Sequence, residues 1–247
     1  MGLHFFVFLH LVLIIHWFIM EKPYLLCIET STEICSVALA HEAECIALKE
    51  CNTNNSHAKN MIPFVEGVLQ QAAIQKEQLN AIAVGIGPGS YTGLRIGVST
   101  AKGLAYSLDI PVIAISTLES FAEPYMTLAD HCRPMIDARR MEVFTALYDR
   151  HGQLLEEPNA KIVDENSFSE ELINFKTVFC GNGAAKCETL LSQYPNAIIK
   201  AAPLSARNMC SIAFRKFQAK QFEDVAYFEP YYLKDYIAAK PKIKGLV

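Results

Sequence analysis

Residues 81–108 read AIAVGIGPGSYTGLRIGVSTAKGLAYSL and contain the features that decide the fold. The first seven are apolar or glycine, which is typical of a buried strand. A glycine-rich turn, PGSYTG, follows, and residues 94–108 then repeat apolar side chains at helical spacing. A buried strand that leads through a glycine turn into a helix is a basic unit of an α/β fold.

The segments around this unit extend the same pattern. Upstream, residues 24–51 contain three short apolar runs, which predict three strands joined by tight turns. Residues 56–74 predict a helix capped by Ser56, either bent at Pro63 or starting late, because proline removes a backbone hydrogen bond. Downstream, residues 110–116 predict a fifth strand. The order β-β-β-α-β-α-β places helices over a mixed sheet.

The order of element types then recurs, although no repeat of individual residues is visible. The second series consists of strands in 134–157, a short helix at 168–175, a strand with a glycine turn at 177–185, and a helix at 205–221. We therefore predict two similar lobes, each with a mixed sheet flanked by helices. Their expected ranges are 22–125 and 126–225, followed by a C-terminal tail, 226–247.

Composition and charge exclude several classes of protein. The chain has 247 residues, 51% hydrophobic and 19% charged, which is too apolar for a disordered protein. Its 22 Lys+Arg against 26 Asp+Glu lack the basic excess of a stand-alone nucleic-acid binder. Any RNA contact therefore needs a basic partner or a local patch. The eight cysteines form no C-x-x-C pair and are interpreted as reduced core thiols of a cytoplasmic protein.

Residues 1–19 differ from the rest because they contain no Asp, Glu, Lys or Arg. They have no basic start and no small-residue cleavage site, so they do not resemble a secretory signal. We expect them to be upstream translated sequence, with the cellular protein beginning at or near Met20. The alternative is a genuine membrane anchor.

The glycine-rich turn within residues 85–97 has two interpretations. Its backbone N–H groups can cradle an anion, or its glycines can serve a structural turn alone. It is neither a P-loop nor a dinucleotide fingerprint nor a nucleophile elbow. Two carboxylates that follow strands, Glu29 and Asp137, are further candidates. The candidate contacts for an anion or nucleotide are therefore Glu29, Gly87, Gly89, Ser90 and Asp137. Asp137, in IDARR (136–140), has the alternative role of an ion pair with Arg139 that supports the second lobe.

Small residues recur every four positions in the helix that follows this turn, and such a face lets another backbone approach closely. The face packs either on the protein's own sheet or on a second chain. Residues 94–108 carry only Arg95 and Lys102 as charges, and residues 61–74 only Glu66, so we expect an apolar association surface. The candidate partner interface comprises Met61, Val65, Val68, Leu69, Ala72, Gly93, Gly97 and Ala101.

Catalytic constellations are scarce in the sequence. His57 is followed four residues later by Met61, so the second ligand of an H-x-x-x-H metal pair is missing. No nucleophile with a neighbouring base is visible. We therefore assign no catalytic residue and no metal ligand.

Several motifs together resemble the bacterial TsaB family, once described as glycoprotease-like. They are IETSTEICSVAL (28–39), SHAKNMIPFVEGVL (56–69), GPGSYTGLRIGVSTAKGLA (87–105), IDARRMEVF (136–144) and EPYYLK (229–234). The resemblance spans about residues 22–236, and its most specific part is GPGSYTGLRIG followed by AKGLA. One departure is Lys234, where an arginine is usual.

The resemblance implies a duplicated actin-like, sugar-kinase-like fold and a role in tRNA modification. The family belongs to the machinery that places threonylcarbamoyl on N6 of the adenosine 3′ of the anticodon, in tRNAs reading codons that begin with A. In that machinery TsaC makes threonylcarbamoyl-adenylate, TsaD holds the metal and transfers the group, and TsaE is an ATPase. TsaB is the non-catalytic paralogue that docks against TsaD through two helices, and it pairs with itself when TsaD is absent.

For this chain the resemblance implies a cytoplasmic scaffold subunit with no cofactor of its own. The metal and ATP are expected on the partner subunits, and the chain is expected to contact tRNA only as part of the complex. Weak nucleotide binding by this chain is compatible with the resemblance. The first alternative is an actin-fold ATP-dependent small-molecule kinase, in which Glu29 and Asp137 face Mg–ATP from the two lobes. The second, a metallopeptidase, is disfavoured because His57 lacks its metal-binding partner.

Overall fold

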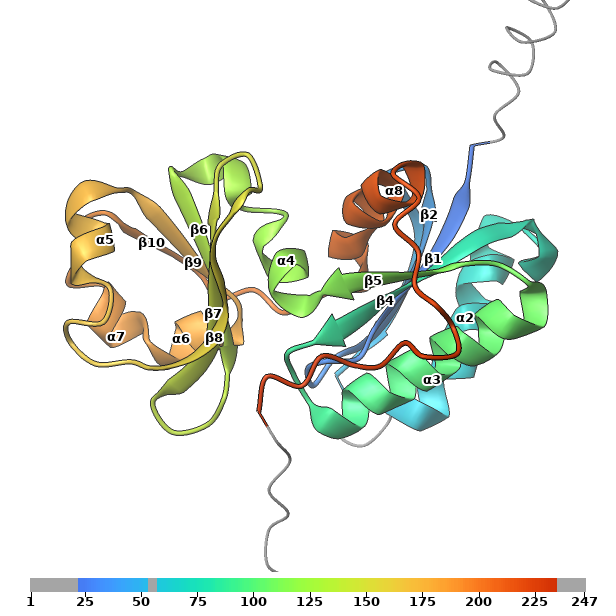
Figure 1. Ribbon diagram of the computed structural model, residues 1–247, viewed down its shortest axis with the longest axis horizontal. Helices are drawn as coiled ribbons and strands as arrows, with labels where there is room; N and C mark the ends of the chain where they lie inside the picture. The colour runs from blue at the N-terminus through green and yellow to red at the C-terminus, as the bar shows by residue number, and fades with distance from the viewer. Residues whose placement is uncertain (1–21, 53–56, 235–247) are drawn as a thin grey trace, which may run out of the picture.

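The computed structural model describes residues 22–52 and 57–234, so the expectations for residues 1–19 and for Ser56 lie outside the described residues. The described chain forms two lobes, each built on one five-stranded sheet (Figure 1). No helix within those residues has both the length and the apolar character that a membrane span requires.

The first sheet contains the three predicted meander strands and the two crossover strands. Its strands are β1 (Tyr24–Glu29), β2 (Cys35–His41), β3 (Glu44–Cys51), β4 (Leu79–Gly87) and β5 (Val112–Ser116). They lie in the order β3-β2-β1-β4-β5. The meander pairs are antiparallel, and β1, β4 and β5 are parallel to one another.

The second sheet repeats this arrangement. Its strands are β6 (His131–Asp137), β7 (Glu142–Asp149), β8 (Leu154–Ile162), β9 (Thr177–Cys180) and β10 (Ala197–Lys200). Starting from the edge strand of the meander, the order is β8-β7-β6-β9-β10. It matches the order of the first sheet strand for strand, with the same parallel and antiparallel pairs. The predicted α/β class and duplicated actin-like fold are confirmed.

Helices cover both faces of the first sheet (Figure 1). One face packs against α2 (His57–Ala72), which continues through Pro63, and α3 (Tyr91–Leu108). The other face packs against the 3₁₀ turn η3 (Ala206–Met209) and α8 (Cys210–Gln218). The chain therefore returns to the first lobe after the second sheet. This return corrects the expected boundary, which assigned residues 126–225 to the second lobe.

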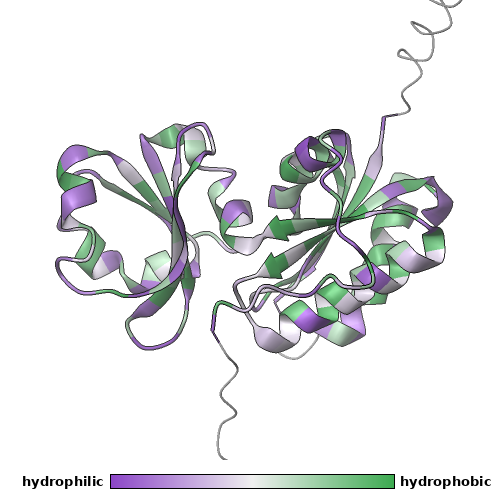
Figure 2. Ribbon diagram, viewed as in Figure 1, coloured by the Kyte–Doolittle hydropathy of each residue, from purple (hydrophilic) through white to green (hydrophobic). Residues whose placement is uncertain are grey.

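Shorter helices complete the structure. In the second lobe α5 (Ser169–Asn174), α6 (Asn182–Lys186) and α7 (Glu188–Leu191) lie on one face of the sheet, and α4 (Thr117–Ala122) with the turn η2 (Met126–Leu128) lies on the other. The turn η1 (Lys76–Gln78) precedes β4. Figure 2 shows apolar residues concentrated on the central strands of the first sheet, and the buried clusters of the second lobe draw on β6, β7 and β9. Of the eight cysteines, all described, six are buried and none is in a disulfide.

Residues 222–234 form an extended segment that we call the C-terminal strap. It begins beside β5, where Glu223 N donates to Val112 O at 2.9 Å, and runs back along α3 toward the space between the lobes (Figure 1). Phe228 inserts its ring into the core between the first sheet and α3. The strap is thus part of the first lobe although it comes last in sequence.

Candidate functional site

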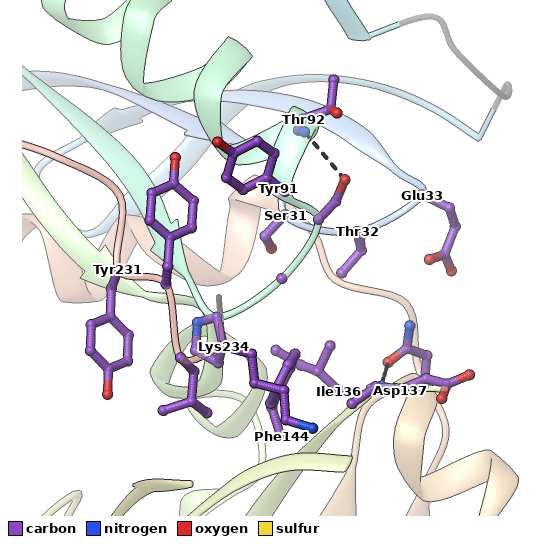
Figure 3. Close-up of a pocket in the computed structure, with 18 of the residues that line it drawn as sticks. Ser31, Thr32, Glu33, Tyr91, Thr92, Ile136, Asp137, Phe144, Tyr231 and Lys234 are labelled. Atoms are coloured by element: carbon purple, nitrogen blue, oxygen red, sulfur yellow. Dashed lines mark hydrogen bonds between the residues drawn. The ribbon is translucent and has the colours of Figure 1, made fainter. Parts of the chain in front are cut away.

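A cavity of about 830 Å³ lies between the two lobes (Figure 3). Four segments contribute most of its lining: the β1–β2 turn, the loop that enters α3, the end of β6 with the turn after it, and the last residues of the strap. Both lobes and the strap are therefore needed to form it.

The glycine-rich loop is shaped by close backbone contacts. Ser90 caps α3, because its Oγ accepts a hydrogen bond from Gly93 N at 3.2 Å. A Cβ on Gly89 would stand 2.4 Å from Ser31 O, and one on Gly87, whose φ is +115°, 2.6 Å from Tyr231 O. These two glycines therefore let the β1–β2 turn and the strap reach the loop. Of the candidate anion contacts in this loop, Gly89 and Ser90 line the cavity.

Glu29 lies beneath the cavity instead of lining it. Its side chain is fully buried, its Oε1 accepts a hydrogen bond from Ser31 N at 2.7 Å, and Gly85 packs directly against its carboxyl group. Burial raises the pKa of this carboxyl above its ordinary value of 4.5. Asp137 lines the cavity from the other lobe, so the two carboxylates that the kinase hypothesis requires do not face each other across it.

We predict that Glu29→Gln stabilises the protein at neutral pH. The raised pKa means that the folded protein disfavours the carboxylate, so wild-type stability falls as pH rises above about 4.5 toward the folded-state value. Glutamine keeps an acceptor for Ser31 N and does not ionise. Each unit of raised pKa corresponds to about 1.4 kcal/mol. Thermal unfolding measured from pH 4 to 8 tests this prediction. The melting temperature of Glu29→Gln must exceed that of the wild type by an amount that grows with pH. A difference in melting temperature that stays constant contradicts the raised pKa of Glu29.

Asp137 is held by a lysine that sequence reasoning missed. Its Oδ1 forms an ion pair with Lys186 Nζ and accepts a hydrogen bond from Arg139 N at 2.8 Å. Its own N–H donates to Asn182 Oδ1 at 3.0 Å. The expected ion pair with Arg139 is wrong, because Arg139 contributes its backbone and Lys186 supplies the charge. Lys186 lies 49 residues away in sequence, so no local signal pointed to it.

His57 also lines the cavity, and its ring has a structural contact. Its Nε2 donates to Thr32 O at 3.0 Å, which ties the start of α2 to the β1–β2 turn. Met61, one turn later, is 1% exposed and belongs to the core. The histidine therefore bridges two elements of the first lobe.

The strap closes the cavity and was not foreseen from the sequence. Lys102 Nζ donates to Phe228 O at 3.0 Å, and Tyr231 N donates to Ile86 O at 2.8 Å, which fix the strap along α3 and β4. Lys234 Nζ then reaches Glu142 Oε2 of the second lobe at 2.5 Å. The strap thus connects the two lobes at the cavity, with the rings of Tyr231 and Tyr232 along its wall.

The small-residue face of α3 packs inside the first lobe. A Cβ on Gly93 would lie 2.0 Å from Thr30 O, and one on Gly97 2.3 Å from Thr30 Oγ1. Thr30 Oγ1 also donates to Gly93 O at 2.8 Å. These contacts decide between the two interpretations of the face: the approaching backbone is the protein's own β1–β2 turn.

The expected partner interface therefore needs correction. Six of its eight residues are buried in the isolated lobe and cannot reach a second chain, because they pack on the first sheet or on the β1–β2 turn: Met61, Val65, Val68, Gly93, Gly97 and Ala101. The other two, Leu69 and Ala72, are partly buried against the same core.

The outward faces of α2 and α3 present a different set of side chains. On α2, Ile62 is 48% exposed, and on α3, Tyr106 is 85% exposed. Gly103 is exposed as well, and a Cβ there would meet nothing within 4 Å. No contact inside the lobe therefore requires a glycine at this position, although an interior helix glycine costs about 1 kcal/mol relative to alanine. Ser99, four residues before Gly103 on α3, is exposed too. We call Ile62, Ser99, Gly103 and Tyr106 the outer helix face.

Comparison with known proteins is consistent with this architecture. A family model described as TsaD, tRNA N6-adenosine threonylcarbamoyltransferase, matches residues 51–247. The tRNA threonylcarbamoyladenosine biosynthesis protein TsaB of Escherichia coli is 32% identical over 232 residues, which cover 90% of this chain and 98% of that protein. The chain belongs to the TsaB family. The resemblance expected from the motifs is confirmed.

Other matches to the TsaB family are shorter or structural. The TsaB proteins of Bacillus subtilis and Haemophilus influenzae are 40% and 39% identical, over 54% and 51% of this chain. In those alignments the chain spans 58% and 53% of the relatives' length. The solved structure of YeaZ from Pseudomonas aeruginosa superposes with a TM-score of 0.73 at 29% identity, covering 85% of this chain and 100% of that chain.

Proposed function

We propose that the chain acts in the biosynthesis of threonylcarbamoyladenosine in tRNA, as a cytoplasmic non-catalytic subunit that docks against a TsaD-like catalytic paralogue. Membership in the TsaB family supports the pathway. The modified position is N6 of the adenosine 3′ of the anticodon in tRNAs reading codons that begin with A.

The contacts of the residues that the two alternative activities would require support a scaffold role. Glu29 is buried beneath Gly85, His57 donates to a backbone carbonyl, and Asp137 is paired with Lys186. Each of the three is occupied in holding the chain's own structure. We place the metal and ATP of the reaction on the partner subunits, the TsaD-like transferase and a TsaE-like ATPase.

The outer helix face is the surface that we propose for docking. Gly103 carries this assignment, because it leaves an open position on an exposed helix and no contact within the lobe needs that opening. A neighbouring helix can approach closely over a glycine; Tyr106, three residues further along α3, and Ile62, on α2, add exposed apolar area to these helices. Without the TsaD-like protein, we expect the same face to pair two copies of this chain.

We predict that reconstitution of threonylcarbamoyladenosine synthesis from purified proteins will distinguish a scaffold role of this chain from a catalytic one. The pure chain, given tRNA and threonylcarbamoyl-adenylate, should form no modified adenosine, because residues 22–52 and 57–234 contain no cluster of His, Cys, Asp and Glu that could hold a metal ion, and His57 and Asp137 are engaged in structural contacts. Addition of the cognate TsaD-like and TsaE-like proteins should restore synthesis, and omission of the chain should abolish it. Mass spectrometry of nucleosides from the tRNA measures both results. Transfer by the chain alone would refute the scaffold assignment.

A further inference from the structure

The turn between β6 and β7, residues 138–141, has an unusual backbone. Arg139 and Arg140 are consecutive residues with positive φ, 71° and 50°. Ala138 N donates to Glu142 O, and Glu142 N donates to Arg139 O, each at 3.1 Å, so hydrogen bonds hold the hairpin in this form. Positions with positive φ favour glycine, and after it asparagine, because a longer or branched side chain has steric conflict there. Two arginines therefore occupy positions that local folding alone would give to other residues.

The charges around this turn leave both arginines without counterions. The two nearest carboxylates along the chain are already neutralised, Asp137 by Lys186 and Glu142 by Lys234. Arg139 and Arg140 are exposed, Arg139 at the edge of the cavity, and within the described residues their guanidinium groups form no ion pair or hydrogen bond. The turn is thus a local patch of two positive charges on a chain whose net charge is −4.

Apolar side chains flank the two arginines. Met141 is 39% exposed in the turn itself, and Ile162 is 72% exposed at the end of β8. The two are adjacent, because Val163 N donates to Met141 O at 2.7 Å and Ile162 is paired with Glu142. We call Arg139, Arg140, Met141 and Ile162 the arginine turn. It combines guanidinium groups, which match phosphate oxygens, with apolar groups that can lie against a ribose or base.

We propose that the arginine turn contacts the phosphodiester backbone of the tRNA substrate. The proposal rests on the proposed function, in which the chain is part of an assembly that holds tRNA. The turn lies in the second lobe, whereas the outer helix face lies in the first (Figure 1), so the two proposed surfaces do not overlap. Because the rest of the chain is acidic, this patch supplies the local basic site that an RNA contact requires.

Salt-dependent tRNA binding tests the proposal. The complex of this chain with its TsaD-like paralogue is titrated with cognate tRNA at several salt concentrations. Each phosphate contact adds about 1 to the slope of log affinity against log salt, so Arg139→Ala with Arg140→Ala should lower the slope by about 2. Arg139→Lys with Arg140→Lys should retain most of it. Arg150→Ala with Lys176→Ala removes two exposed cations at the opposite end of the same sheet and should leave the slope unchanged.

A second variant separates binding from folding. Arg139→Asn with Arg140→Gly suits the turn better, so its melting temperature should equal or exceed that of the wild type while the salt slope falls as in the alanine variant. Gel filtration of every variant with the TsaD-like protein tests the proposed docking separately. An unchanged slope overturns the tRNA contact, and so does the absence of salt-dependent binding by the wild-type chain, alone and in the complex. Loss of paralogue binding instead assigns the turn to an acidic protein surface.

Discussion

Val65→Glu is expected to unfold the first lobe. Val65 is 5% exposed and belongs to the apolar cluster that α2 forms with the first sheet, together with Val37 and Leu39. A carboxylate there has no partner, and whether it stays charged or takes up a proton its burial costs several kcal/mol, a large part of the roughly 5–15 kcal/mol that stabilises a typical domain. The variant should therefore be insoluble or show no cooperative thermal transition.

Ile62→Glu is the matched control on the same helix. Ile62 lies three residues earlier than Val65 and is 48% exposed, so a glutamate there stays in water. Its effect on the free energy of unfolding should remain within about 0.5 kcal/mol, and its melting temperature within a few degrees of the wild type. Circular dichroism during heating distinguishes the two variants. If Val65→Glu melts as the wild type does, the burial of this face of α2 is wrong.

Gly103→Glu is expected to abolish association with the TsaD-like paralogue while leaving the lobe folded. The position has open space around it, so the glutamate side chain meets no steric conflict in the monomer. Glutamate also has a higher helix propensity than glycine, so the substitution does not weaken α3. In a closely packed helix interface the new side chain separates the two helices and buries a charge. Such a change near the centre of an interface costs several kcal/mol, which corresponds to at least a hundredfold weaker binding.

The measurement pairs this variant with Ile62→Glu and a control on the second lobe. Both outer-face variants should lose co-purification with the paralogue and the synthesis of modified adenosine. Ile173→Glu changes an apolar side chain that is 72% exposed on α5, and it should retain both. Full binding by Gly103→Glu and Ile62→Glu would show that docking uses another surface.

The sequence by itself determined the order of the main elements, without α4 and β10, and the family. Strand and helix periodicities are local, so the recurrent series of strands and helices was readable, and it led to the duplicated α/β fold that the two sheets confirm. The motifs around residues 87–105 and 136–144 are contiguous stretches, so they identified the TsaB family without any spatial information.

Only the tertiary structure decided which side of each helix is free. Gly93, Gly97 and Gly103 look alike in the sequence, but Thr30, more than sixty residues earlier, packs against the first two and leaves the third open. Contacts between distant segments also place α8 on the first lobe, bury the Glu29 carboxyl group against Gly85 and pair Asp137 with Lys186. Each of these facts depends on contacts between distant segments, and a local pattern does not specify which segment will fill the space beside it.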